Sequence, residues 1–240
     1  MILFFSGTGN SLQVAERLAS LLDERLLNME CVGIPQLKDD EPLGIVFPVY
    51  AWGLPRLVKS FLKNINVGER YVWCVMTCGD DMGYADKVLQ KALSRKLDAA
   101  FSVQMPNTYV CLPGFDVDSD ELAASKRQKT MDRLAGIAEV IGNRSVCREL
   151  TRGGMAWCKT YLLRPLFNAF LVTDKYFKTS DACSQCGLCA KSCPMHDIVL
   201  QDGRVVWKHQ DCTGCLRCYH KCPKRAVDWG KYTRGKGQKR

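Results

Sequence analysis

Short apolar runs alternate with helical patterns through the first 150 residues of the chain. Four runs have the length of a buried strand: 2–5, 44–50, 71–76 and 101–105. Apolar residues recur at helical spacing between them, over 12–22 and again over 57–62. Strands that are apolar on both faces and alternate with helices are typical of a parallel sheet covered by helices. The pattern therefore predicts an α/β domain over residues 1–150.

Two further elements follow from local signals. Residues 120–141 form one predicted helix, and Ser119 is its expected N-cap. Two short apolar runs, 198–200 and 205–207, flank a turn that contains Asp202-Gly203. Asp-Gly between apolar runs is a strong signal for a β-hairpin.

An apolar segment at 153–173 joins the two halves of the chain. Lys159, Arg164 and Pro165 interrupt it, and it is too short and too charged for a bilayer span, which needs about 20 apolar residues. We expect this segment, within a connector at 151–178, to pack between two domains. A helix that lies on a membrane surface is the less favoured alternative.

Eight of the 14 cysteines form two copies of one motif near the end of the chain. Each copy reads C-x2-C-x2-C-x3-C-P. The cysteines are Cys183, Cys186, Cys189 and Cys193 in the first copy, and Cys212, Cys215, Cys218 and Cys222 in the second. Thiolates are soft ligands, and closely spaced cysteines on a tight loop suit the successive corners of an iron–sulfur cube.

This spacing resembles that of bacterial-type ferredoxins with two [4Fe-4S] clusters, in which the fourth cysteine of each run ligates the other cluster. The resemblance implies one cluster on Cys183, Cys186, Cys189 and Cys222, and another on Cys212, Cys215, Cys218 and Cys193. A zinc site is disfavoured because three cysteines at successive x2 gaps would crowd one tetrahedral ion. A disulfide framework would need an oxidising compartment, of which there is no other sign. We expect a ferredoxin domain at 179–230.

A loop of hydroxyls and glycines joins the first predicted strand to the first predicted helix. Its residues are Ser6, Gly7, Thr8, Gly9, Asn10 and Ser11. Backbone N–H groups and the positive end of a helix dipole meet at such a loop, so we expect it to bind an anion.

Three kinds of phosphate loop compete for these residues. The loop has no lysine, which excludes a P-loop nucleoside triphosphatase. Leu12 stands where a dinucleotide fingerprint has its third glycine, although Glu30 is a partial match to the ribose-binding acid of that motif. The short polar side chains suit a terminal phosphomonoester and resemble the flavodoxin phosphate loop.

Two more loops resemble the flavin-binding loops of flavodoxins. They follow the runs at 44–50 and 71–76, and their candidate residues are Tyr50, Ala51, Trp52, Gly53, Thr77, Cys78, Gly79 and Tyr84. Ligands bind at the carboxyl ends of strands in a doubly wound sheet, where the strand order reverses. The resemblance implies that Tyr50 and Trp52 cover a flavin ring. Each aromatic alone is typical of an ordinary loop, but three strand ends directed at one crevice predict an FMN site.

The formal net charge of +9 is weak evidence for a nucleic-acid partner. Each oxidised cluster with its four thiolates carries about −2, and a bound phosphate up to about −2, which brings the total near +3. We expect no nucleic-acid partner. The basic tail at 231–240 is expected to be solvated and disordered. Docking of the tail to an acidic redox partner or an anionic membrane surface is the less favoured alternative.

The remaining cysteines and the histidines show no metal-binding spacing. Cys31, Cys74, Cys78, Cys111, Cys147 and Cys158 are expected to be small buried or half-buried thiols. His196, His209 and His220 are expected to be surface groups or outer neighbours of the clusters. No basic region precedes the first apolar run, so we expect no signal peptide and, given iron–sulfur ligation, a cytoplasmic location.

The order of flavodoxin-like domain, connector and two-cluster ferredoxin resembles the bacterial and archaeal fused flavodoxin–ferredoxin family, often called EFR-type ferredoxins. The resemblance covers nearly the whole chain. It implies a doubly wound flavodoxin-like sheet followed by a small α+β domain, and an electron-transfer protein that relays electrons between two [4Fe-4S] clusters and FMN for redox partner proteins. Two alternatives stay open. The flavodoxin-like domain could be a cofactor-free docking module, or the protein could be a flavin-dependent reductase, for example of a quinone.

Overall fold

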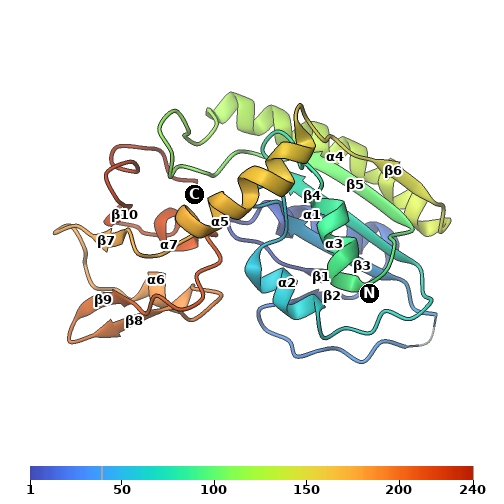
Figure 1. Ribbon diagram of the computed structural model, residues 1–240, viewed down its shortest axis with the longest axis horizontal. Helices are drawn as coiled ribbons and strands as arrows, with labels where there is room; N and C mark the ends of the chain where they lie inside the picture. The colour runs from blue at the N-terminus through green and yellow to red at the C-terminus, as the bar shows by residue number, and fades with distance from the viewer. Residues whose placement is uncertain (39, 240) are drawn as a thin grey trace.

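The computed structural model describes residues 1–38 and 40–239 (Figure 1). Its first part is a six-stranded parallel sheet with the order β2-β1-β3-β4-β5-β6. The strands are β1 (Ile2–Phe4), β2 (Leu26–Asn28), β3 (Leu43–Pro48), β4 (Val72–Cys78), β5 (Ala99–Gln104) and β6 (Cys147–Glu149). The first five follow the order 2-1-3-4-5 of a flavodoxin-like doubly wound sheet, which reverses between β1 and β3. The predicted fold class is confirmed.

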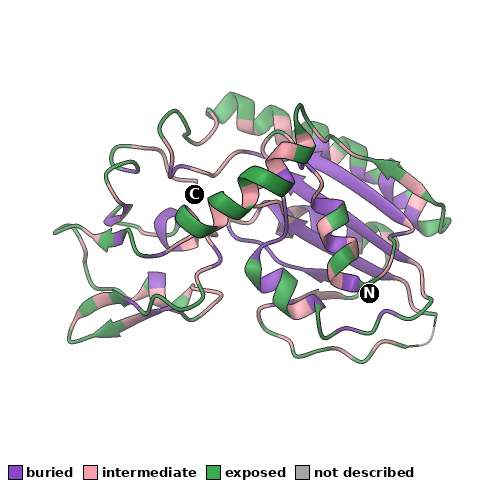
Figure 2. Cartoon of the chain, in the orientation of Figure 1, coloured by how far each residue is buried: buried purple, intermediate pink, exposed green. Residues whose placement is uncertain are grey.

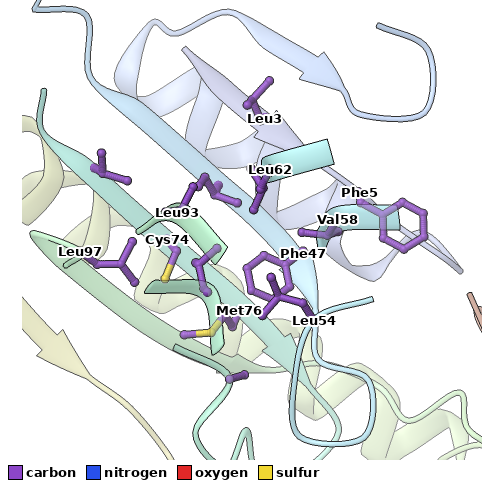
Figure 3. Packing of buried hydrophobic residues seen from close by; sticks show 14 of the residues in the cluster. Leu3, Phe5, Phe47, Leu54, Val58, Leu62, Cys74, Met76, Leu93 and Leu97 are labelled. Atoms are coloured by element: carbon purple, nitrogen blue, oxygen red, sulfur yellow. The ribbon is translucent and has the colours of Figure 1, made fainter. Parts of the chain in front are cut away.

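Helices cover both faces of this sheet. They are α1 (Asn10–Leu22), α2 (Arg56–Leu62), α3 (Ala85–Leu93) and α4 (Asp120–Gly142). One core cluster packs α2 and α3 against Phe47 and Met76 of the sheet (Figure 3). A second packs α1 and α4 against Phe101 on the opposite face. The central strands are therefore buried on both sides, and every residue of β4 is buried (Figure 2).

The strand β3 ends two residues before the predicted 44–50, because the chain turns sharply there. The backbones of Tyr50 and Gly53 exchange two hydrogen bonds, of 3.0 and 3.1 Å. Between them, Ala51 and Trp52 have φ angles of 46° and 56°. Two consecutive positive φ angles are typical of a tight type I′ turn. This turn ends the strand and begins the second predicted flavin loop.

Two local predictions are confirmed. The Ser119 hydroxyl accepts a hydrogen bond of 3.3 Å from the backbone N–H of Leu122, as an N-cap of α4 does. The predicted hairpin consists of β8 (Ile198–Gln201) and β9 (Arg204–Trp207), which pair antiparallel. Asp202 and Gly203 at its turn both have positive φ, which suits the Asp-Gly sequence.

The C-terminal part is a small α+β unit around its own core. Strand β7 (Phe177–Thr179) pairs antiparallel with β10 (Val227–Trp229), and the short helices α6 (Leu188–Lys191) and α7 (Arg217–His220) lie between them in sequence. The rings of Phe177 and Trp207 stack 5.8 Å apart in this core. Since β7 begins at Phe177, this unit starts within the segment predicted as connector.

The connector is helical and runs between the two parts of the molecule (Figure 1). It comprises a π-helical turn η1 (Cys158–Leu163) and helix α5 (Arg164–Phe170). One side packs inward: Phe167 lies 6.1 Å from the Trp52 ring, and Val172 lies against Gly214. The other side exposes large apolar residues: Met155, Trp157, Tyr161, Leu162, Leu163, Leu166 and Phe170.

The expected packing between domains thus holds for the inward side of the connector. The membrane-surface alternative stays a prediction. Within residues 1–38 and 40–239, no helix has the length and apolar character needed to cross a bilayer.

The prediction of a solvated, disordered basic tail is wrong for residues 236–239. The Lys236 ammonium donates hydrogen bonds of 2.7 and 2.6 Å to the carbonyls of Val110 and Leu112. The Gly237 N–H donates to Asp116 Oδ1 at 2.9 Å. These acceptors belong to the loop after β5. Hydrogen bonds to this loop therefore fix the C-terminal segment, although its basic composition is typical of a solvated tail. Arg240 lies outside the described residues.

Candidate functional site

The loops that follow β1, β3, β4 and β5 surround one cavity of about 250 Å³. It lies at the carboxyl edge of the sheet, where the strand order reverses and where doubly wound sheets bind ligands. Eleven of the predicted flavin residues line it: Ser6, Gly7, Thr8, Asn10, Ser11, Tyr50, Ala51, Trp52, Thr77, Cys78 and Gly79. The three predicted loops therefore meet at one site.

The phosphate loop is held in shape by its own polar groups and by the neighbouring loops. The Ser6 hydroxyl accepts a hydrogen bond of 3.1 Å from the Gly9 N–H. The Asn10 amide donates to the Pro106 carbonyl at 2.8 Å, and the hydroxyls of Ser11 and Thr77 lie 2.7 Å apart. Helix α1 begins at Asn10, so its N-terminus faces the loop. This arrangement suits an anion.

Three of the predicted flavin residues do not line the cavity. Gly9 has a φ of 98° and precedes α1 as its cap, which is a conformation that favours glycine. A Cβ on Gly53 would overlap the guanidinium of Arg164. The Tyr84 ring lies against the connector side, with the Arg152 guanidinium 4.3 Å from its centre.

Other residues of the cavity were not predicted from the sequence. Asn107, Thr108 and Tyr109 follow β5, and they could have been included by the same strand-end rule. Phe167 comes from the connector, and Thr213–Leu216 come from the ferredoxin-like part. Nothing in their local sequence indicates this position, because it depends on how the two parts dock.

Three buried polar atoms around the cavity have no hydrogen-bond partner within the described chain: Asp81 Oδ1, the Tyr109 hydroxyl and Thr213 Oγ1. Buried polar groups nearly always have partners, and an unsatisfied one is destabilising by about 1–3 kcal/mol. Burial also raises the pKa of Tyr109, so its hydroxyl stays a donor. The cavity therefore suits a ligand that combines a flat apolar surface with polar edges, and the predicted flavin fits that description.

The eight motif cysteines divide into two groups around two smaller cavities. Cys183, Cys186, Cys189 and Cys222 line one of them. Cys193, Cys212, Cys215 and Cys218 line the other. This is the grouping that the crossed ligation predicts, since the fourth cysteine of each run lies with the other run. Within the described residues, no group of three or more His, Cys, Asp or Glu side chains is arranged to hold a single metal ion. Four more widely spaced thiols suit the four iron corners of a [4Fe-4S] cluster.

The second group is buried more deeply than the first. Burial raises the pKa of the Cys212 thiol to about 12 and that of Cys215 to about 11. Cys186 is exposed, and a hydrogen bond from the Leu188 N–H lowers its pKa. Buried thiols of this kind become thiolates only when a metal replaces the proton, so cluster binding would release protons.

Cys215 also lines the cavity of about 250 Å³ in which the flavin is predicted to bind, called the flavin cavity below. A Cβ on Gly7 of the phosphate loop would lie 3.1 Å from the Cβ and the carbonyl oxygen of Cys215, which shows how closely the two loops approach. The deeper cysteine group and the predicted flavin site are thus direct neighbours.

Arg217 joins the two parts at this boundary. Its guanidinium donates to the carbonyls of Gly7 at 2.9 Å and Ser6 at 2.5 Å. The same group pairs with both carboxylate oxygens of Glu30, and the Arg217 and Glu30 side chains are each only 12% exposed. Glu30 therefore neutralises Arg217, which gives it a role other than the ribose contact of a dinucleotide site.

His220 lies at the same boundary and is buried, which contradicts the expected surface position but agrees with that of an outer neighbour of a cluster. Its Nε2 lies 2.8 Å from the Thr108 carbonyl, so Nε2 donates, and its Nδ1 accepts from the Lys239 N–H at 3.1 Å. Burial lowers the pKa of His220 to about 4. The imidazole is therefore neutral at physiological pH and joins the loop after β5 to the tail.

A small change at Gly7 is expected to disturb the phosphate loop and the cysteine loop together. In Gly7→Ala, the new methyl group would overlap the Tyr50 hydroxyl and crowd Cys215. We expect a loss of about 1–3 kcal/mol in the free energy of unfolding, as for other overpacked sites, and weaker flavin binding. Urea unfolding and FMN titration measure both. Gly33→Ala is the matched control, because a Cβ there meets nothing within 4 Å; equal effects of the two substitutions would contradict the prediction.

Comparison with known proteins identifies the C-terminal part of the chain. The 4Fe-4S dicluster domain family matches residues 175–226. No curated protein matches the chain significantly. Similar solved structures include the flavodoxin of Streptococcus pneumoniae TIGR4, with a TM-score of 0.36, 14% identity and coverage of 57% of this chain and 97% of that chain. A proposed flavoprotein from Bacteroides uniformis ATCC 8492 has a TM-score of 0.36, 16% identity and coverage of 43% and 88%.

The strand order of the sheet defines the first part independently of these similarities. The chain is thus a flavodoxin-like α/β domain joined to a 4Fe-4S dicluster domain.

Proposed function

We propose that this protein is an electron carrier in which two [4Fe-4S] clusters exchange electrons with an FMN bound in the flavodoxin-like domain. When bound, FMN accepts one or two electrons and each cluster one, so the fusion couples one-electron to two-electron chemistry. The observation that supports this most directly is the position of Cys215, which lines both the deeper cysteine cavity and the flavin cavity.

The residues around the three cavities suit a series of redox sites. Cys186 is exposed, so the first cysteine group is accessible to a redox partner protein. Cys193 lies four residues after Cys189 and Cys222 four residues after Cys218, yet each lines the cavity of the other run. The two cysteine cavities are therefore adjacent. The single loop Thr213–Leu216 lies between the deeper cysteine group and the flavin cavity. We propose cytoplasmic redox proteins as partners and no nucleic acid.

The shape of the flavin cavity favours a carrier over a quinone-type reductase. Its walls include the ferredoxin loop Thr213–Leu216 and Phe167 of the connector. At about 250 Å³, the cavity is smaller than most pockets for small organic ligands, which leaves little room for a second organic molecule beside the flavin. The unsatisfied polar atoms of Tyr109 and Thr213 in turn favour a bound cofactor over an empty docking module.

A cofactor assay on anaerobically purified full-length protein tests the proposal. We expect about eight irons, an equal amount of acid-labile sulfide and one acid-released FMN per chain. Eight irons without flavin, even after reconstitution with FMN, would show that the first domain is a docking module. Catalytic turnover of quinones by the loaded protein would instead favour the reductase.

A further inference from the structure

The C-terminal segment reaches the phosphate loop. The Lys239 ammonium contacts Asn10 Oδ1, and Asn10 is the first residue of α1. Lys239 also lines a groove of about 440 Å³ on the outer side of the loop, together with Gly7, Thr8 and Lys221. The groove shares Gly7 and Thr8 with the flavin cavity and has no acidic residue in its lining.

Several hydrogen bonds fix Lys239 in this position. Its backbone N–H donates to Nδ1 of the buried His220 at 3.1 Å. The neighbouring Gln238 amide donates to the Tyr219 carbonyl at 2.6 Å, and the Tyr219 hydroxyl donates to the Lys236 carbonyl at 3.1 Å. The ammonium is therefore placed at the start of α1 by the fold of the tail.

A cation is electrostatically unfavourable at this position unless an anion accompanies it. The N-terminus of α1 carries the positive end of the helix dipole. Burial, followed by the charge of nearby Arg127, lowers the pKa of Lys239 to about 8. Neither Lys239 nor Arg127 forms a salt bridge within residues 1–38 and 40–239, and Arg127 Nε is buried without a hydrogen-bond partner. An anion bound at this end of α1 would reduce the unfavourable charge.

We propose that Lys239 pairs with the phosphate of the flavin and that the tail closes the phosphate loop from its outer side. This inference rests on the proposed FMN site and assigns a new binding residue to it. The loop Ser6–Ser11 has no charged side chain, so Lys239 provides a full positive charge for the phosphate. A phosphate dianion in turn would compensate the Lys239 ammonium and the positive end of α1.

The test compares FMN with riboflavin, which lacks the phosphate. Full-length, iron-loaded protein that has been freed of flavin is titrated with each compound, and flavin fluorescence reports the dissociation constant. In Lys239→Gln we expect FMN binding to weaken by at least about tenfold, as for loss of a hydrogen bond to a charged group. Riboflavin binding should be unchanged. Lys239→Arg should restore most of the FMN affinity.

Lys231→Gln serves as the matched control, because Lys231 lies in the same tail, is exposed, and has its ammonium 5.6 Å from the centre of the Tyr232 ring. Iron content and far-UV circular dichroism establish that each variant is folded. Equal FMN affinity in wild type and Lys239→Gln would overturn this inference and leave the electron carrier intact. Equal weakening for FMN and riboflavin would also overturn it, because the lysine would then act through the shape of the tail. A wild-type protein that binds neither compound would refute the proposed flavin site itself.

Discussion

Replacing Cys193 with serine is expected to remove the cluster of the second cysteine run and to leave the other cluster in place. Cys193 belongs to the first run in sequence but lines the cavity of Cys212, Cys215 and Cys218. The iron content should fall from about eight to about four per chain. Iron and acid-labile sulfide are measured on anaerobically purified protein. The EPR spectrum of the reduced variant should show one isolated cluster.

Double substitutions identify which cluster is lost. Under crossed ligation, Cys193→Ser combined with Cys212→Ser affects one cluster only, so iron stays at about four. Cys193→Ser combined with Cys183→Ser affects both clusters, so almost no iron remains. If each run ligated its own cluster, these two results would be exchanged. Cys31→Ser is the control, because Cys31 is exposed and lines neither cysteine cavity, and it should keep all of its iron.

The features that the sequence predicts well are those that depend on local spacing. The order of strand, polar loop and helix within 22 residues is found in the structure, and Ser6 and Ser11 lie at the cavity. Phosphate binding by this loop stays a prediction. The cysteine groups follow from ligand spacing in the same way. The hairpin at Asp202 and Gly203 needs only a two-residue turn. Each of these signals lies within one short stretch of chain.

The features that the sequence does not predict depend on the docking of the two parts. Thr213–Leu216 line the flavin cavity only because the ferredoxin-like part lies against the phosphate loop. By composition, Lys236 and Lys239 belong to a solvated run of basic residues. In the structure, Lys236 donates to a carbonyl of the loop after β5, and Lys239 donates to the side chain of Asn10. Likewise, Tyr84 follows a strand end but packs with Arg152, which comes from the start of the connector. Periodicity and motif spacing contain no information about such partners.

Cys31 illustrates the same limit on a smaller scale. Buried or half-buried thiols were expected, and Cys74, Cys78 and Cys111 are buried, but Cys31 is exposed. It follows the short strand β2 at the edge of the sheet, beyond which no further strand pairs within the described residues. Burial at an edge depends on neighbours that the local composition does not specify.

The second large effect is expected at the contact between the domains. In Arg217→Met, the Glu30 carboxylate would stay largely buried without a counter-ion, and the carbonyls of Ser6 and Gly7 would lose a donor. Breaking a buried ion pair from one side destabilises a protein by about 3–5 kcal/mol. We expect a loss of this size in the free energy of unfolding, measured by anaerobic urea denaturation.

Two companion variants separate the ion pair from other effects of the substitution. Arg17→Met removes an exposed arginine from α1 and should change the free energy of unfolding by less than about 0.5 kcal/mol. Arg217→Met combined with Glu30→Met removes both charges and should recover much of the lost stability, because no buried charge is left unpaired. A loss below about 1 kcal/mol in Arg217→Met would mean that the pair behaves like a solvent-exposed one. In that case Arg217 would not hold the phosphate loop and the cysteine loop together, and the close approach of Gly7 to Cys215 would need another cause.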